Sequence, residues 1–266
     1  MENESRGTLY PARLPTLHRL AAPAEISGLV RWFWIPEWDI APGRVSRQEL
    51  LPFAACNLVV DPGFVGFSGP PTQRSFRDLE GRGWAVGALL RPAAVPYFVA
   101  RPSEVRDTTA EFNAPDLRVA VTAAMTADRD GETYRGEAVS AFSAWIVENI
   151  GAPTPSGSIG NAMADLIDTD PSITRVEHIA DRLSMSVRTV QRLAERYFGL
   201  PPLTLIRRRR LQEAAELLRT EPGTSVAAIA SELGYADHAH LANEFRDALG
   251  FTASRYRRSN PGGRGF

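Results

Sequence analysis

The C-terminal third of the chain contains the same spacing of apolar residues twice, 50 residues apart. Both copies carry apolar side chains at helical positions i, i+3, i+4 and i+7, namely Val176, Ile179, Ala180 and Leu183 in the first and Val226, Ile229, Ala230 and Leu233 in the second. Each copy is followed by a short turn and by a second apolar-striped segment that ends at a glycine, Gly199 or Gly250. A short helix, a tight turn and a second helix form a helix-turn-helix, whose second helix enters the major groove of DNA. The pattern therefore predicts two helix-turn-helix units in tandem.

Short apolar runs separated by turn residues fill the region from residue 8 to residue 112. The runs 29–35, 50–60 and 84–90 are rich in aromatic and β-branched residues, and Asp61-Pro-Gly63 is a turn sequence. Runs of this length between Pro and Gly clusters are typical of antiparallel strands. We expect a β-barrel or β-sandwich domain over residues 1–112.

The spacing becomes helical after this region. Leu117 and Val121 belong to one apolar stripe, and a longer stripe runs from Ala138 to Ile150, so two helices are expected over residues 113–150. Their apolar surface either covers the β-domain or forms a dimer seam, and the pattern favours neither.

The remaining segments complete the expected organisation. The Pro-, Gly- and Ser-rich stretch 151–158 is expected to be a linker. Residues 159–258 are expected to form an all-α DNA-binding domain, and residues 259–266 a disordered tail. The expected fold class is α+β: a β-barrel or sandwich with two helices, followed by an all-α domain with two helix-turn-helix units.

The outward faces of the two recognition helices carry the side chains expected to read bases. Ser186 is a suitable N-cap for the first helix, and Asp237 for the second. Arg and Gln near a helix N-terminus can make bidentate contacts with guanine and adenine, whereas Ala can only touch a thymine methyl group. The second face is therefore chemically poorer than the first. The expected base contacts are Arg188, Gln191 and Arg192 in the first unit and His238, Ala239, Ala242 and Asn243 in the second.

Other polar residues are expected to contact phosphates, which position a protein on DNA without reading its sequence. Four consecutive arginines, 207–210, lie on the helix expected between the two units. Successive helical residues point in different directions, so only one or two of the four can reach the same DNA backbone. The expected phosphate contacts are Ser186, Arg207, Arg208, Arg246 and Arg257.

Charge is distributed unevenly along the chain. Residues 1–171 carry 15 Arg and 21 Asp or Glu, whereas residues 172–266 carry 15 Arg and 10 Asp or Glu. A basic terminal region on an acidic body is typical of proteins that bind nucleic acid through one end. All 30 basic residues are arginine, so every cationic contact with DNA would be a guanidinium capable of bidentate hydrogen bonding.

The sequence shows no pattern that favours catalysis or metal binding. Cys56 is the only cysteine and lies in the apolar run 53–60, so it is expected to be buried. The four histidines lack metal-ligand spacing, and no phosphate-binding glycine loop or nucleophile elbow occurs. We therefore expect no enzyme activity, no cofactor and no metal. Without a signal-peptide pattern or a long apolar run, we expect a cytoplasmic protein with no membrane partner.

Several short motifs follow one another in the C-terminal region. They are Ile179-Ala180-x-x-Leu183, Val190-Gln191-Arg192-Leu193, Phe198-Gly199, Ile229-Ala230-x-x-Leu233-Gly234-Tyr235 and Phe245-Arg246-x-x-x-Gly250-Phe251. In these motifs residues 172–258 resemble the DNA-binding domain of the AraC/XylS family of bacterial transcription regulators. The resemblance implies operator DNA and RNA polymerase as partners. Ala194-Glu195 depart from the aromatic and basic pair usual in the family, which removes one expected phosphate contact.

The N-terminal region is similar, more weakly, to the barrel-type (cupin-like) sensor domains of one branch of that family. This resemblance implies a small-molecule effector, a homodimer, or both. Six aromatic residues either line a ligand pocket or fill the core: Trp32, Trp34, Phe53, Phe67, Trp84 and Tyr97. The alternative is a ligand-independent regulator whose N-terminal domain only oligomerises or contacts RNA polymerase. A more remote alternative is a DNA-repair protein that accepts a methyl group on Cys56.

Overall fold

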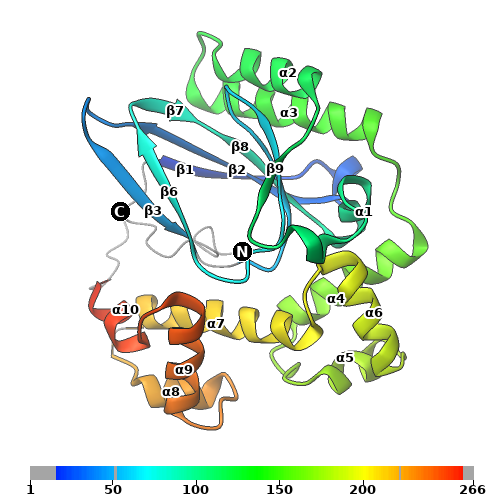
Figure 1. The fold of residues 1–266 in the computed structure, drawn as a ribbon, viewed down its shortest axis with the longest axis vertical. Helices are drawn as coiled ribbons and strands as arrows, with labels where there is room; N and C mark the ends of the chain where they lie inside the picture. Colours follow the sequence, from blue (N-terminus) through cyan, green and yellow to red (C-terminus); the bar gives the residue numbers. More distant parts are fainter. Residues whose placement is uncertain (1–15, 51–52, 222, 260–266) are drawn as a thin grey trace.

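The computed structural model describes residues 16–50, 53–221 and 223–259. Strands occupy the N-terminal part and helices the C-terminal part, as expected from the sequence (Figure 1). The strands are β1 (Thr16–Ala21), β2 (Val30–Asp39), β3 (Val45–Leu50), β4 (Asn57–Val60), β5 (Val65–Ser68), β6 (Ser75–Glu80), β7 (Arg82–Trp84), β8 (Val86–Leu90) and β9 (Thr109–Glu111). Short helical segments join them: η2 (Ala24–Ile26), η3 (Pro92–Ala94), α1 (Val95–Phe98) and η4 (Pro102–Val105).

A seven-stranded antiparallel sheet forms the framework of this part, in the order β1-β2-β8-β4-β5-β9 with β7 paired to β2. A two-stranded antiparallel sheet of β3 and β6, which β4 and β5 separate in the chain, lies beside it. Trp38 of β2 donates from Nε1 to the Glu80 carbonyl at 3.1 Å, and Arg77 of β6 donates to Thr109 Oγ1 at 3.4 Å. The two-stranded sheet thus contacts strands near both ends of the seven-stranded order, as a barrel-like arrangement requires.

Helices α2 (Pro115–Met125) and α3 (Gly131–Asn149) cover one face of the sheet (Figure 1). Side chains alternate along β2, so Phe33 and Ile35 belong to the buried core beneath these helices. The rings of Phe33 and Phe142 meet edge to face, with centroids 5.3 Å apart. Leu117, Val121 and Ile146 are buried in the same core. The apolar stripes of both helices therefore pack against the sheet of the same chain. We call residues 16–150 the β-domain.

The expected linker is shorter than predicted. Helix α4 spans Pro155–Thr169, so it begins four residues before the expected start of the DNA-binding domain at 159. Thr154 caps it by accepting a hydrogen bond from the Gly157 N–H at 3.0 Å, and Pro155 occupies the first turn, where proline is favoured. The prediction followed composition and overlooked this helix-start signal.

The remaining helices form two clusters around one long helix. They are α5 (Val176–Arg182), α6 (Val187–Phe198), α7 (Pro202–Thr220), α8 (Val226–Glu232), α9 (His238–Leu249) and α10 (Ala253–Ser259). One buried core lies among α4, α5, α6 and the start of α7. A second lies among the end of α7, α8, α9 and α10. Residues 260–266 of the expected disordered tail lie outside the described residues.

Candidate nucleic-acid interface

The first helix-turn-helix unit consists of α5 and α6. Ile179 and Ala180 of α5 are buried against Val190 and Ala194 of α6. The turn is closed by a hydrogen bond from the Met185 N–H to the Ala180 carbonyl at 2.8 Å. As predicted, Ser186 caps α6 by accepting from the Thr189 N–H at 3.2 Å, so this side chain fixes the start of the recognition helix.

The outward face of α6 carries the predicted base-contacting residues. Arg188, Gln191 and Arg192 are all exposed, because they lie opposite the buried stripe of the helix. Among the described residues, none of the three forms an ion pair. Their guanidinium and amide groups are therefore directed to solvent along one face, where bidentate contacts with bases are sterically open.

The second unit consists of α8 and α9 and repeats this geometry. The Tyr235 N–H bonds to the Ala230 carbonyl at 2.8 Å across the turn, and Asp237 caps α9 by accepting from the His240 N–H at 2.7 Å. The predicted contacts His238, Ala239 and Asn243 are exposed and Ala242 is half-buried. Asn243 Oδ1 accepts a hydrogen bond from Arg246 at 2.9 Å, which orients the amide on this face.

Helix α7 joins the two units, which lie at its opposite ends (Figure 1). Nineteen helical residues span about 28 Å at 1.5 Å per residue. Arg209, only 3% exposed, donates to Glu213 at 2.9 Å and to the Ile173 carbonyl at 3.0 Å, just before α5. Arg210 donates to the Leu233 carbonyl at 2.9 Å and lies 3.8 Å from the centre of the Tyr235 ring. These two arginines fasten one unit each to the connecting helix.

A half-buried carboxylate adds a further link within the second unit. Glu244 of α9 accepts a hydrogen bond from the Tyr235 hydroxyl at 2.9 Å and pairs with Arg207 at 3.3 Å. Burial, followed by the charge of Glu244, raises the pKa of Tyr235, so the hydroxyl remains a donor. Sequence reasoning did not identify Glu244, because its partners Tyr235 and Arg207 come from the turn before α9 and from α7.

The predicted phosphate contacts divide into two groups. Ser186, Arg207 and Arg246 are exposed. Arg207 is exposed although it pairs with Glu244. Arg208 instead turns toward the β-domain and donates to the Thr72 carbonyl, and Arg257 donates to the Thr224 carbonyl at 2.6 Å. In this arrangement, both of these guanidinium groups are engaged in holding the protein together. The phosphate contacts predicted for Arg208 and Arg257 stay predictions, since each guanidinium has further N–H groups besides the one bonded to a carbonyl oxygen.

Two parts of the chain match known families. Residues 179–259 match the family described as "Helix-turn-helix domain", and residues 18–111 match the one described as "Domain of unknown function (DUF6597)". The C-terminal part of the chain is an AraC-type helix-turn-helix domain, and we call helices α4 to α10, residues 155–259, the AraC-type domain. Its two units are those built on α5–α6 and α8–α9.

The AraC-type domain has relatives among transcription regulators. It is similar to the HTH-type transcriptional activator RhaS of Escherichia fergusonii, with 38% identity over 81 residues, or 30% of this chain and 29% of that protein. It is also similar to an uncharacterized HTH-type transcriptional regulator of Haemophilus influenzae, with 30% identity over 101 residues, or 38% of this chain and 34% of that protein. The chain thus matches about a third of the length of these curated relatives.

Solved structures also align with the chain. ToxT from Vibrio cholerae aligns over 93% of this chain and 98% of its own, with 12% identity and a TM-score of 0.46. The C-terminal domain of AraT, a response regulator from Geobacillus stearothermophilus, aligns over 40% of this chain and 88% of its own, with 24% identity and a TM-score of 0.37.

The AraC-type domain is docked on the β-domain through polar contacts. Asn161 of α4 is buried, accepts from the Ala93 N–H at 3.0 Å and donates to the Gly28 carbonyl at 2.8 Å. Arg106 donates from Nε to the Gly199 carbonyl at the end of α6. At the second unit, the Arg74 N–H bonds to the Ala248 carbonyl at 3.3 Å. The β-domain therefore contacts both helix-turn-helix units.

The six aromatic residues predicted as pocket or core do not gather around one site. Trp32 and Phe53 meet edge to face at 5.7 Å, and Trp34 donates from Nε1 to Asn57. Phe67 stacks on Phe98 within the core, 5.5 Å between centroids. Trp84 packs against that same core. Tyr97 is exposed and donates from its hydroxyl to the Ala152 carbonyl.

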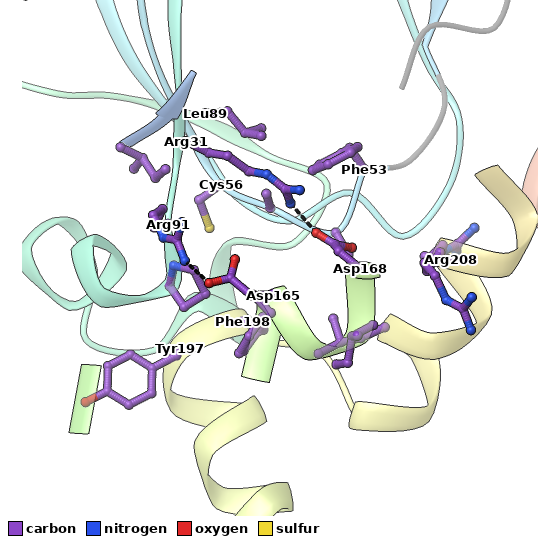
Figure 2. A pocket seen from close by; sticks show the side chains of 18 of the residues that line it. Arg31, Phe53, Cys56, Leu89, Arg91, Asp165, Asp168, Tyr197, Phe198 and Arg208 are labelled. Atoms are coloured by element: carbon purple, nitrogen blue, oxygen red, sulfur yellow. Dashed lines mark hydrogen bonds and ion pairs between the residues drawn. The ribbon is translucent and has the colours of Figure 1, made fainter. Parts of the chain in front are cut away.

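A cavity does lie between the two domains, and Phe53 is the one member of that set that lines it. Figure 2 shows Arg31 and Arg91 extending from the β-domain toward Asp168 and Asp165 of α4, with which they form ion pairs.

The remaining structural expectations concern Cys56, metal binding and the membrane. Burial raises the pKa of the Cys56 thiol to about 12, which argues against a methyl-accepting role because the thiolate is the nucleophile. Within the described ranges, no group of His, Cys, Asp and Glu side chains is arranged to hold a metal ion. No helix in those ranges is long and apolar enough to cross a membrane.

Proposed function

We propose that this protein is a transcription regulator that binds double-stranded operator DNA with both recognition helices. The observation that carries the proposal is the placement of two helix-turn-helix units at the ends of one helix, each with its outward face uncovered. Arg209 and Arg210 hold each unit to α7 through buried hydrogen bonds. A fixed pair of recognition helices can enter successive turns of one groove face without paying the entropy of ordering a linker.

Each reading face has its own proposed role. Arg188, Gln191 and Arg192 read base edges in the first half-site. His238, Ala239, Ala242 and Asn243 face the second half-site, where they discriminate less because few of them can form bidentate contacts. Ser186, Arg207 and Arg246 contact phosphates and contribute the salt-dependent part of the affinity.

The β-domain is proposed to regulate this DNA-binding domain by sensing a small molecule, by forming a homodimer, or by both. The support is its direct contact with both units, through Arg106 at α6 and through Thr72 and Arg74 at α7 and α9. The alternative is a β-domain that senses nothing and only oligomerises or contacts RNA polymerase. Native mass spectrometry of the purified protein separates these proposals, since it reports both a retained small molecule and the oligomeric state.

DNA binding is tested by selecting sites from random duplexes with the full-length protein, followed by fluorescence anisotropy on the selected site. We expect Arg188→Ala and Arg192→Ala each to lose about 1–3 kcal/mol on the selected site and little on random DNA. Arg101→Ala, which removes an exposed arginine of the β-domain, is the matched control. Equal losses on both DNAs would identify the two arginines as phosphate contacts. Absence of DNA binding at low salt would refute the proposed function.

A further inference from the structure

The cavity between the domains has a volume of about 60 Å³. It is bounded by the β-domain on one side and by α4, α6 and α7 on the other (Figure 2). Its lining combines apolar side chains, including Phe53, Cys56 and Phe198, with charged groups. A water needs roughly 10–15 Å³ of such space, so the cavity has room for about four waters or for a small organic molecule.

The charged groups of the cavity form two ion pairs across the domain boundary. Arg31 of β2 pairs with Asp168, and Arg91, just after β8, pairs with Asp165 one turn earlier on α4. The second pair is asymmetric, because the side chain of Arg91 is 19% exposed and that of Asp165 is 51% exposed. The arginine is thus held in place by the protein, while the carboxylate is the partner that solvent reaches.

The guanidinium of Arg91 also has unused hydrogen-bonding capacity. Its Nη2 donates to Asp165 Oδ2 at 2.5 Å, but its Nε is buried and has no hydrogen-bond partner among the described residues. A buried N–H without an acceptor destabilises the arrangement that contains it. A carboxylate that lies in the plane of the guanidinium can accept from Nε and Nη2 together, which the Asp165 side chain does not do here.

We propose that this cavity binds a small organic carboxylate, which replaces Asp165 as the partner of Arg91. The carboxylate accepts hydrogen bonds from Nε and Nη2 of Arg91, and its short apolar chain lies between Phe53 and Cys56 of the β-domain and Phe198 of α6. The exchange is one carboxylate for another, so the charge of Arg91 stays paired throughout. The free energy of binding is favourable because the ligand accepts a second hydrogen bond that Asp165 does not accept, and because it buries apolar surface.

This inference rests on the regulatory role proposed for the β-domain and gives it a ligand class. Helix α4 belongs to the core of the first helix-turn-helix unit. Replacing Asp165 removes one of the two ion pairs that hold α4 to the β-domain, so ligand binding is thermodynamically linked to domain docking.

Binding is tested on the full-length protein by isothermal titration calorimetry with butyrate, with no DNA present. Butyramide has the same shape without the charge, and inorganic phosphate supplies the charge without the apolar chain. We expect saturable one-site binding of butyrate and at least tenfold weaker binding of the other two. Comparable binding of butyramide would overturn the proposed ion pair, and tighter binding of phosphate would overturn the organic carboxylate as the ligand class.

Two variants locate the site. Arg91→Gln is expected to weaken butyrate binding at least tenfold, and Arg101→Gln, outside the cavity, leaves it unchanged. Asp165→Asn removes the internal competitor and is expected to tighten binding at least threefold, so the test still holds if Arg91→Gln does not fold. The proposal is wrong if butyrate binds neither the wild type nor Asp165→Asn, or if either variant binds it as the wild type does. DNA binding is measured separately, so this failure leaves the proposed function untouched.

Discussion

Arg207, Arg208, Arg209 and Arg210 have the same chemistry and entirely different surroundings. Successive positions on a helix are 100° apart, which directs them to α9, to the β-domain, to the segment before α5 and to the turn of the second unit. A run of four cations on a DNA-binding domain suggests phosphate contacts, yet three of these groups are bonded to main-chain carbonyl oxygens. Their role in this arrangement is to hold the parts of the protein together.

Substitutions in this run should separate stability from DNA binding. Arg209→Ala removes the hydrogen bonds to Glu213 and to the Ile173 carbonyl, so we expect a loss of about 2–3 kcal/mol in the free energy of unfolding. Arg207→Ala removes a side chain that is 54% exposed and should cost at most about 1 kcal/mol. Urea unfolding followed by circular dichroism measures both. Equal losses for the two variants would contradict this assignment.

Asp130 provides a prediction about pH. Hydrogen bonds from the Thr133 side chain and N–H at the start of α3 lower the pKa of Asp130 in the folded protein. A depressed pKa stabilises the fold above the pKa of the unfolded chain, and this contribution is lost as the pH falls through the folded value. Asp130→Asn keeps a capping acceptor without the charge. We expect its urea midpoint to fall less than that of the wild type between about pH 5 and pH 3. Asp128→Asn, at an exposed carboxylate that caps no described helix, should behave as wild type.

Local sequence is sufficient to predict the roles of some residues and insufficient for others. Ser186 and Asp237 were predicted as N-caps, and both accept the expected backbone hydrogen bonds, because capping depends only on the next three residues. The roles of Arg208 and Arg257 depend on carbonyl groups 136 and 33 residues away. No local pattern reports such partners.

Both recognition helices, α6 and α9, end in a glycine with left-handed backbone conformation. The φ angles are 66° at Gly199 and 73° at Gly250, and a side chain strains such a position by about 1–2 kcal/mol. The surroundings of the two ends differ. A Cβ at Gly199 would lie 2.6 Å from backbone atoms of Pro102 and Ser103, whereas one at Gly250 would meet only the end of the flexible Arg74 side chain, at 3.0 Å.

Alanine substitution at these two helix ends should therefore have unequal effects. Gly250→Ala should lower the thermal unfolding midpoint only by the cost of placing a side chain in the left-handed conformation. Gly199→Ala should lower the midpoint further. The backbone of η4 must move away from the new side chain, and the hydrogen bond from Arg106 to the Gly199 carbonyl is disturbed. Thermal unfolding midpoints of the two variants provide the comparison. A lower midpoint for Gly250→Ala than for Gly199→Ala would contradict this account of the domain contact.

Elements with strong periodicity were the most predictable ones. The helix-turn-helix pairs appear where the spacing of Ile179, Ala180 and their later counterparts placed them, and α3 follows its predicted stripe. Composition misled at residues 155–158, where Pro, Gly and Ser form the first turn of α4. Small residues are needed there because Gly157 packs closely on Ala93, a contact that appears only once the domains are in place.

The whole molecule combines a rigid pair of DNA-binding units with a β-domain that contacts both. Its ion pairs run from arginines of the β-domain to aspartates of α4, as between Arg31 and Asp168, 137 residues apart in the chain. The excess of basic charge in the C-terminal region gave no indication that the β-domain would supply the cations and α4 the carboxylates of these pairs. Domain docking is a property of the assembled surfaces, so sequence reasoning could not reach it.

Rigid spacing leads to a prediction about the DNA site. Two half-sites read from one face of the duplex lie about one helical turn, or 10–10.5 base pairs, apart. Inserting five base pairs between them turns the second half-site to the opposite face. We expect affinity, as measured by anisotropy, to fall at least as low as that of the double variant His238→Ala/Asn243→Ala on the uninterrupted site, because that variant keeps the phosphate contact proposed for Arg246. An insertion of ten base pairs lengthens the spacing between the half-sites by about one helical turn and leaves them on the same face, so it separates the effect of length from that of rotation. Unchanged affinity with five added base pairs would show that the two units bind independently.

The unequal chemistry of the two reading faces gives the bound protein a direction. A symmetric dimer on a palindrome looks the same from both ends, but one chain with an Arg- and Gln-rich unit followed by an Ala-rich unit does not. Turning the site around in a promoter would turn the bound protein end for end, so the β-domain would present its opposite side to a neighbouring protein. The orientation of the site, and not only its position, would then decide which neighbouring protein the β-domain can meet.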